Sequence, residues 1–189
     1  DLQGPKIRVG DLPEKGIKLV KGQTVEVPVT YPDLYKDVKK GDRILLDDGL
    51  LEGRCVSGKK GFLKFEVKIG GPLTSHKGMN FPDTTLSVSA ITEKDKRDAV
   101  FAVQQKCEWV ALSFVTDPKD IRHLRRILSK AAEKDQPLPK IIAKIEKHEA
   151  IRRFDEILKE ADAIMVARGD LGIETAAEQV PLVQKEIIS

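Results

Sequence analysis

The sequence predicts an α/β protein made of two parts, a β-rich part at about residues 5–88 and a parallel sheet with helices after it. In the first part, short runs of branched apolar residues alternate with glycine-containing turns. That pattern is typical of a small barrel or a sandwich. From about Thr92, apolar runs alternate strictly with helical patterns, which indicates βαβ units and a parallel sheet.

The β-rich part is punctuated by turn signals between its apolar runs. Asp47-Asp48-Gly49 is a strong turn signal, and the glycine-containing segment 57–61 separates two later runs. The expected strands lie at residues 23–30, 43–46, 51–57 and 62–69.

The second part carries start signals for helices. Thr92, followed three residues later by Asp95, resembles a helix N-terminal cap, and Pro118 after Asp117 suits the first turn of the next helix. Strands are expected at 109–115, 140–146 and 162–167, and helices at about 92–106, from 117 on, at 148–161 and from about 176 to the end. Leu158 is expected on the apolar face of the helix at 148–161. Three parallel strands cannot close a barrel alone.

The composition excludes several classes of function. The chain of 189 residues has 40% hydrophobic and 33% charged residues, as an ordinary globular protein does. A net charge of +3, with basic and acidic residues interleaved and few aromatic residues, argues against a nucleic-acid partner. No apolar stretch is long enough to cross a membrane. Cys55 and Cys107 form no CxxC pair, so zinc and redox chemistry are not expected.

Charged side chains stand where two of the expected strands end. Side chains alternate along a strand, so Lys144 and Glu146 point the same way at the end of one strand. Arg168 and Asp170 follow the next strand. Enzymes with parallel sheets place their chemistry at the carboxyl ends of strands. Two carboxylates, a lysine and an arginine there suit a divalent metal that holds a phosphorylated anion.

At these residues the chain resembles the pyruvate kinases. The resemblance rests on I-I-A-K-I-E at 141–146, M-V-A-R-G-D-L-G-I-E at 165–174, D-L-Q-G-P-K-I-R at 1–8 and H-K-G-M-N-F-P at 76–82. It implies part of a (β/α)8, or TIM, barrel at residues 1–4 and 89–189, with a small β-barrel lid domain inserted at 5–88. The chain would hold the end of barrel strand three, the lid, and strands four to six. We therefore interpret both chain ends as cuts through a larger protein.

The resemblance also implies an activity and roles for the charged residues. The parent protein would transfer the phosphoryl group of phosphoenolpyruvate to ADP in cytoplasmic glycolysis, giving pyruvate and ATP, and the isolated fragment would be inactive. Lys144 would be catalytic, and Glu146 and Asp170 would bind Mg²⁺ or Mn²⁺. The substrate-binding residues would be Gly169, Ser113 and Arg168, with Arg168 mainly forming an ion pair that shapes its loop. Family members are commonly homotetramers.

Further roles follow for the lid and for a monovalent cation. Arg8, Lys77 and Asp48 would meet the nucleotide and its metal. Asp1 matches a family ligand of the monovalent cation. Lys6 stands where members that depend on K⁺ usually have Glu, so its ammonium is expected to replace K⁺.

Two other readings stay open at this stage. Other enzymes of phosphoenolpyruvate and enolates use the same barrel with Mg²⁺ and lysine, although they would lack the inserted lid sequence. Alternatively, the chain could bind metal or ligand weakly without turnover.

Overall fold

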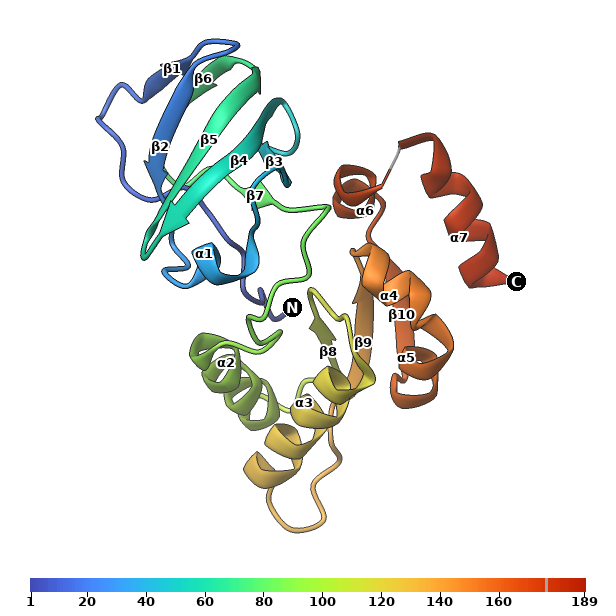
Figure 1. Cartoon of the computed structure of the whole chain (residues 1–189). Coiled ribbons are helices and arrows are strands. Elements are labelled where there is room, and N and C mark those ends of the chain that lie inside the picture. Colours follow the sequence, from blue (N-terminus) through green and yellow to red (C-terminus); the bar gives the residue numbers. More distant parts are fainter. Residues whose placement is uncertain (176) are drawn as a thin grey trace. The chain divides into compact units, whose positions relative to one another are not determined.

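The computed structural model describes residues 1–175 and 177–189. The chain forms two compact units, one of residues 6–87 and one of residues 1–5 together with 88–189. Figure 1 shows the first unit as strands and the second as strands alternating with helices. Among the described residues, no helix is both long and apolar enough to cross a membrane.

The unit at residues 6–87 is a β structure with one short helix. Its elements are β1 (Ile17–Leu19), β2 (Thr24–Pro28), α1 (Leu34–Asp37), β3 (Arg43–Leu46), β4 (Leu51–Lys59), β5 (Phe62–Ile69), β6 (Gly71–Leu73) and β7 (Met79–Asn80). The predicted strands are present. β4 extends to Lys59, into the segment 57–61 that was expected to be a loop, and the turn is limited to residues 60–61. The short elements β1, β6, β7 and α1 were not predicted.

The strands of this unit close on themselves. β2, β5, β4, β3 and β7 form an antiparallel sheet in that order, and β1 pairs with β6. Val9 bridges to Val29 beyond β2, and Arg8 bridges to Gly78 before β7, so one segment joins both edges of the sheet. Closure removes exposed sheet edges and gives a small barrel, one of the two architectures that the spacing of the strands had indicated.

Period-two alternation supplies the core of the barrel. In β5, Leu63, Phe65 and Val67 are fully buried, and the residues between them are not. The facing strands add Val27, Ile44 and Leu46 to the same hydrophobic cluster. Burying such side chains provides most of the favourable free energy of folding.

The second unit alternates strands with helices. Its elements are α2 (Glu93–Gln104), β8 (Trp109–Leu112), α3 (Pro118–Ala131), β9 (Lys140–Ile145), α4 (His148–Arg152), α5 (Phe154–Glu160), β10 (Ala163–Val166), α6 (Arg168–Glu174), the 3₁₀ turn η1 (Ala177–Gln179) and α7 (Val180–Ile188). β8, β9 and β10 are parallel neighbours, with β9 in the middle. The start of the last predicted helix, at Ala176, lies outside the described residues.

The first residues of the chain extend this sheet beside β8. Leu2 forms a parallel bridge with Leu112, and the backbone N–H of Leu2 donates to the carbonyl of Ala111 at 2.8 Å. The strand order therefore runs from residue 2 through β8 and β9 to β10. A segment that enters the sheet here places the Asp1 side chain at the carboxyl end of β8.

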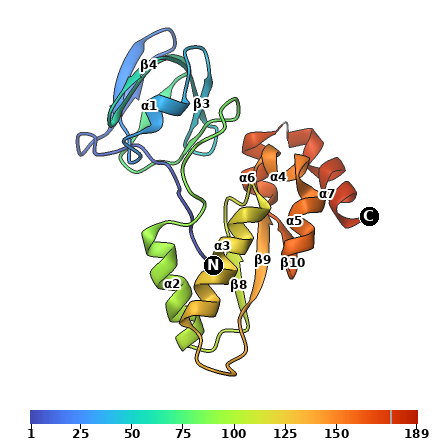
Figure 2. The ribbon, with the colours of Figure 1, turned by 60° about the horizontal axis from the view of Figure 1, so that its bottom comes forward.

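Helices cover one face of the parallel sheet. Ile141, Ala143 and Ile145 of β9 are fully buried in one cluster with apolar residues of α2 and α3. Figure 2 shows α3 lying against β8 and β9. Lys144 alternates with these buried residues and pairs in register with Met165, which is 48% exposed. The uncovered face of the sheet is therefore the face that carries Lys144.

The helix starts predicted from the sequence are confirmed. Thr92 and Asp95 form a complete capping box at α2, and Asp117 and Asp120 form another at α3 with Pro118 in the first turn. Such caps satisfy backbone N–H groups that have no partner inside the helix.

The prediction of a single helix at residues 148–161 is wrong in one respect. The helix divides into α4 and α5 at Arg153, whose φ of −112° and ψ of 21° leave the helical region. The buried residue of α5 is Ile157, and Leu158, expected on the apolar face, is 48% exposed.

Candidate functional site

Lys144 is the centre of a polar cluster at the carboxyl ends of β8 and β9. Its Nζ lies 2.9 Å from Glu146 Oε1, 3.0 Å from Ser113 Oγ and 3.2 Å from Asp1 Oδ2. The side chain of Lys144 is only 13% exposed, so these oxygens rather than bulk water hold the ammonium. An ammonium fixed in this way can stabilise negative charge that develops during a reaction.

Glu146 is a buried carboxylate that contacts both β9 and the segment that follows β8. Its Oε1 pairs with Lys144, as the alternation along β9 predicted, and its Oε2 accepts the backbone N–H of Phe114 at 3.0 Å. Phe114 has a φ of 56°, in the left-handed region that is rare for a residue other than glycine. Such strained positions persist where the surrounding contacts hold them, and they cluster at functional sites.

Asp1 and Ser113 complete the cluster around Lys144. Ser113 is buried at the end of β8, and its hydroxyl donates to Asp1 Oδ1 at 3.3 Å while it accepts from Lys144. The carboxylate of Asp1, predicted to be a cation ligand, is thus also a neighbour of Lys144. The structure brings four of the predicted site residues into direct contact.

The other predicted residues of this unit lie in the first turn of α6. Arg168 and Gly169 are exposed, and Asp170 is half-buried. A Cβ atom built on Gly169 would meet no atom within 4 Å, so the space beside this backbone is open to a ligand. The ion pair expected of Arg168 is not formed with any residue that the structure describes.

The carboxylates at these strand ends could hold a hard divalent cation. β9 and β10 are adjacent and parallel, so Glu146 after β9 and Asp170 after β10 stand at the same edge of the sheet. Mg²⁺ takes one or two carboxylates and fills its other positions with water and substrate oxygens. Over residues 1–175 and 177–189, no three His, Cys, Asp or Glu side chains gather as a metal cage. The donors therefore fit Mg²⁺ or Mn²⁺ better than a closed zinc site.

The predicted nucleotide residues gather at one end of the β unit. Arg8 donates to the carbonyl of His76 at 2.9 Å, and Val9, next to it, donates to the carbonyl of Lys77 at 2.9 Å. Lys77 pairs with Asp47 at 2.8 Å, and Asp48 is exposed in the same turn. Two cations thus lie on neighbouring segments, beside an exposed carboxylate.

The loop that carries Phe114 is also fixed from outside. Asp117 pairs with Arg153 at the break between α4 and α5, and Arg153 also pairs with Glu156. The contact with Glu156, and then that with Asp117, raises the pKa of Arg153. Partial burial acts to raise the pKa of Asp117, but the Lys119 N–H and Arg153 outweigh it, so the pKa of Asp117 lies below its usual range.

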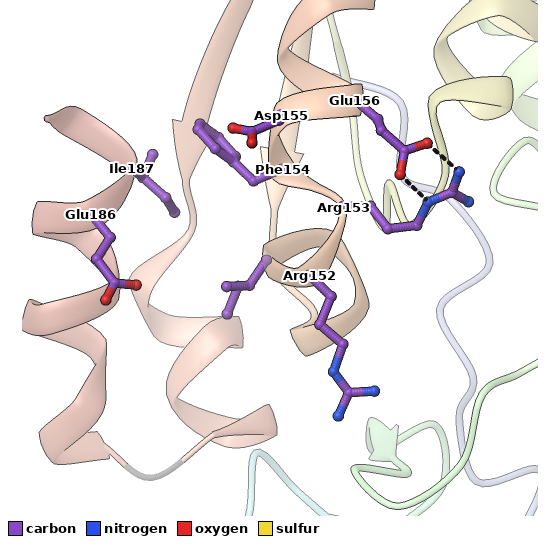
Figure 3. A pocket seen from close by; sticks show the side chains of 8 residues that line it. Arg152, Arg153, Phe154, Asp155, Glu156, Glu186 and Ile187 are labelled. Atoms are coloured by element: carbon purple, nitrogen blue, oxygen red, sulfur yellow. Dashed lines mark hydrogen bonds and ion pairs between the residues drawn. The ribbon is translucent and has the colours of Figure 1, made fainter.

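A separate pocket of about 350 Å³ lies between α4, α5 and α7. Figure 3 shows Arg153 directed at Glu156, away from the other labelled side chains, with Glu186 and Ile187 across the pocket on α7. Its lining mixes cations with carboxylates, and its Arg153 is already paired twice. The pocket therefore offers no concentrated charge for a ligand.

Sequence reasoning missed one charged pair beside the site. Lys147 follows Glu146 directly and is buried, and its Nζ lies 3.7 Å from Glu174 Oε1 at the end of α6. Glu174 is buried as well. The available signal was a charged residue directly after the first matched motif and another at the end of the second. Sequence alone does not pair two positions so far apart.

Comparison with known proteins identifies what the chain is similar to. The family described as "Pyruvate kinase, barrel domain" matches residues 1–189. The chain is 45% identical to Pyruvate kinase 2 of Synechocystis sp., over all of this chain and 34% of that protein. It is 42% identical to the pyruvate kinases of Corynebacterium efficiens and Thermotoga maritima, over all of this chain and 41% and 42% of theirs. The chain thus spans between a third and just over two fifths of the length of these curated relatives.

Proposed function

The chain belongs to the pyruvate kinase family, and from this premise we propose that the complete protein transfers the phosphoryl group of phosphoenolpyruvate to ADP, giving pyruvate and ATP. One observation carries the proposal. The Lys144 ammonium is held among Asp1, Ser113 and Glu146 at the carboxyl ends of parallel strands. Phosphoryl transfer depends mainly on positioning and on charge stabilisation, and this cluster provides both.

Lys144 has the central part in this chemistry. The phosphoryl group in flight and the enolate left behind both carry negative charge, and a fixed ammonium lowers the energy of both. The partners of Lys144 hold the ammonium in place before substrate arrives. Little reorganisation is then needed when the charge develops.

Glu146 and Asp170 are the proposed holders of Mg²⁺ or Mn²⁺. A divalent cation here would supply charge neutralisation for the phosphate and carboxylate oxygens of the substrate. The buried Glu146 is oriented by the Phe114 N–H, and such outer contacts are what fix a metal-binding carboxylate. Ser113, and Gly169 with the neighbouring backbone, would contact the substrate, and the open space at Gly169 supports that role. Arg168, exposed in the same turn, stands as a substrate-binding candidate.

We propose that a positive charge of the protein itself replaces the monovalent cation. Asp1 would form that site, and the Lys6 ammonium would supply the charge that K⁺ provides in other members. Lys6 is exposed, so its ammonium is accessible.

The unit at residues 6–87 is proposed to be the lid domain of the enzyme, inserted in the catalytic (β/α)8 barrel. Arg8, Lys77 and Asp48 would meet ADP and its metal when the lid closes. Closure of a lid excludes water and completes an active site. The grouping of Arg8 and Lys77 on neighbouring segments supports this role.

Other properties follow from the family and are part of the proposal. The complete protein would be a homotetramer that acts in glycolysis in the cytoplasm, with no nucleic-acid or membrane partner. The isolated chain would show no turnover, because a (β/α)8 barrel needs strands that this segment does not contain.

The test is ATP formation from phosphoenolpyruvate and ADP by the full-length protein, in Mg²⁺ without K⁺, beside its Lys144→Met variant. Turnover in the parent and a loss of at least about 10²-fold in the variant are expected, the usual effect of removing a group that stabilises developing charge. Lys140→Met is the matched control, because Lys140 lies on the same strand at the far end and contacts Trp109.

A silent parent would separate the alternatives. If added K⁺ restored turnover, the function would stand and the role of Lys6 would be wrong. If K⁺ had no effect, the protein would be a different enolate enzyme of the same barrel or a binding protein without turnover.

A further inference from the structure

A buried ion pair links the two segments that carry the proposed metal ligands. Lys147 is 9% exposed and Glu174 is 6% exposed, and their Nζ and Oε1 atoms are 3.7 Å apart. His148 lies beside this pair. Its Nδ1 is 3.8 Å from Glu174 Oε2 and 3.4 Å from Glu149 Oε2. Removing one partner of a buried pair leaves an uncompensated charge, so the two partners hold each other in place.

The positions of the two partners give the pair its significance. Lys147 follows Glu146 in the sequence and is the N-cap residue of α4. Glu174 is the last residue of α6, and Asp170 is one helical turn before it, on the same side of the helix. Whatever fixes Glu174 therefore also fixes the rotation of α6 and the direction of the Asp170 carboxylate.

The contacts of α6 show what this pair adds to its packing. Leu171 and Glu174 are its buried residues, whereas Arg168 and Gly169 are exposed. The helix spans only residues 168–174, and helices this short are not stable by themselves. α6 also packs against α7, where Val180 lies 3.7 Å from a Cβ built on Gly172. The Lys147–Glu174 pair adds a charged contact at the far end of the helix, which further restricts its rotation.

We propose that the Lys147–Glu174 ion pair is a positioning clamp that fixes α6 so that Asp170 can bind metal together with Glu146. The proposal rests on the proposed function of the site. Lys147 and Glu174 are positioning residues, because they act through Asp170 and Glu146 rather than on the substrate.

The clamp can be distinguished from a simple effect of charge. Lys147 is positive and lies next to a metal ligand, so by Coulomb attraction alone Lys147→Met would tighten the binding of a divalent cation. Glu174→Gln removes a negative charge and by the same reasoning would weaken it. A clamp predicts that both substitutions weaken binding, because both release α6.

The experiment measures Mn²⁺ binding to the full-length protein by the loss of the free Mn²⁺ signal in electron paramagnetic resonance. Both variants are expected to bind Mn²⁺ about 10- to 100-fold more weakly, the usual cost of losing a contact that orients metal ligands. Lys94→Met breaks an exposed pair with Asp98 on α2 and is the control, expected to bind Mn²⁺ unchanged. Tighter or unchanged binding by Lys147→Met would overturn the clamp.

A second measurement covers the case in which Lys147→Met does not fold. Glu174→Gln keeps the shape of the side chain, and its amide hydrogen exchange over residues 168–175 is expected to be faster than in the unmodified protein. Unchanged exchange in this segment would overturn the clamp. A general loss of stability would instead raise exchange along β8 and β9 as well, and that outcome would also count against it.

Failure of the clamp and failure of the proposed function remain distinguishable. Mn²⁺ binding requires neither phosphoenolpyruvate nor ADP. A protein that binds Mn²⁺, responds to both substitutions as expected and gives no ATP would retain the clamp and lose the function. A protein that binds no Mn²⁺ would overturn the clamp together with the assignment of Glu146 and Asp170.

Discussion

The hydroxyl of Ser113 lies 3.0 Å from the Lys144 ammonium and comes from the strand next to that of the lysine. β8 ends at Leu112, and the backbone turns sharply at Phe114, which leaves Ser113 buried between the ends of two strands. The position of the ammonium therefore depends on how two neighbouring strands end.

Ser113→Ala is expected to lower kcat/KM for phosphoenolpyruvate by about 10- to 100-fold. A hydrogen bond to a charged group contributes roughly 1.5–3 kcal/mol, and its loss lets the ammonium move. Steady-state kinetics of the full-length protein measure the effect. Ser129→Ala removes an exposed hydroxyl on α3 and should leave the kinetics unchanged. Equal activity of Ser113→Ala and the parent would contradict a role for this hydroxyl.

Lys6→Glu is expected to make turnover depend on K⁺. Without K⁺ the variant should lose tenfold or more of its activity, equivalent to roughly 1.4 kcal/mol, because the positive charge that is proposed to replace K⁺ is missing. Added K⁺ should restore the activity, and the same concentration of a larger organic cation is the salt-matched control. If the unmodified protein is itself strongly activated by K⁺, Lys6 does not replace that ion.

Gly53→Ala is expected to weaken the β unit by about 1–3 kcal/mol, the usual cost of overpacking a core. A Cβ at this position would lie 2.4 Å from Cδ2 of Phe65, a fully buried ring that cannot easily move. Gly78→Ala is the control, since its Cβ would approach only the ends of two side chains, Cε of Lys6 at 3.4 Å and Oδ1 of Asp48 at 3.8 Å. Native-state hydrogen exchange in β4 and β5 measures the opening free energy. Equal opening free energies for the two variants would contradict the steric argument.

Asp162 is expected to stabilise the second unit at neutral pH and to lose that effect in acid. Partial burial acts to raise its pKa, but the Ile141 N–H at 2.8 Å and then Arg125 outweigh it, so its pKa is lowered. A carboxyl with a lowered pKa stabilises the fold above its unfolded pKa of about 3.9, and the effect disappears as the pH falls through the folded value below that.

The measurement is the free energy of opening around β9 as a function of pH, for the parent and for Asp162→Asn. The difference should be about 1 kcal/mol at neutral pH, because the group is partly exposed, and should vanish below the folded pKa. Asp155→Asn, at an exposed position on α5, is the control. A difference that persists unchanged into strong acid would show that the charge of Asp162 does not contribute.

Local signals in the sequence predicted much of the fold. The caps at Thr92 and Asp117 were predictable because each depends on groups within three residues of one another. The strand expected at residues 109–115 ends at Leu112, because Phe114 adopts a left-handed conformation to donate its N–H to Glu146. Such a contact between separate strands has no local signature.

The break at Arg153 illustrates the same limit. An uninterrupted helix would keep the spacing from Ile151 to Leu158, but Arg153 leaves the helical conformation and pairs with Asp117 of another element. The buried residues of the two helices are Ala150 and Ile157, and Leu158 is exposed. The alternation of side chains at the end of β9 predicted that Lys144 and Glu146 would lie together, and they do. The pairing of Lys147 with Glu174 depends instead on how α6 packs, for which the sequence has no local signal.

The balance of charge around Lys144 affects the order in which a cation and an anion would bind. Two carboxylates, Asp1 and Glu146, share one ammonium, which leaves the cluster with an excess of negative charge. A cluster in that state attracts cations and repels anions. Once a doubly charged cation is present, the sign reverses and the same cluster attracts an anion. For the proposed reaction, the resting cluster thus favours an ordered encounter, with the cation first and the phosphorylated acid second.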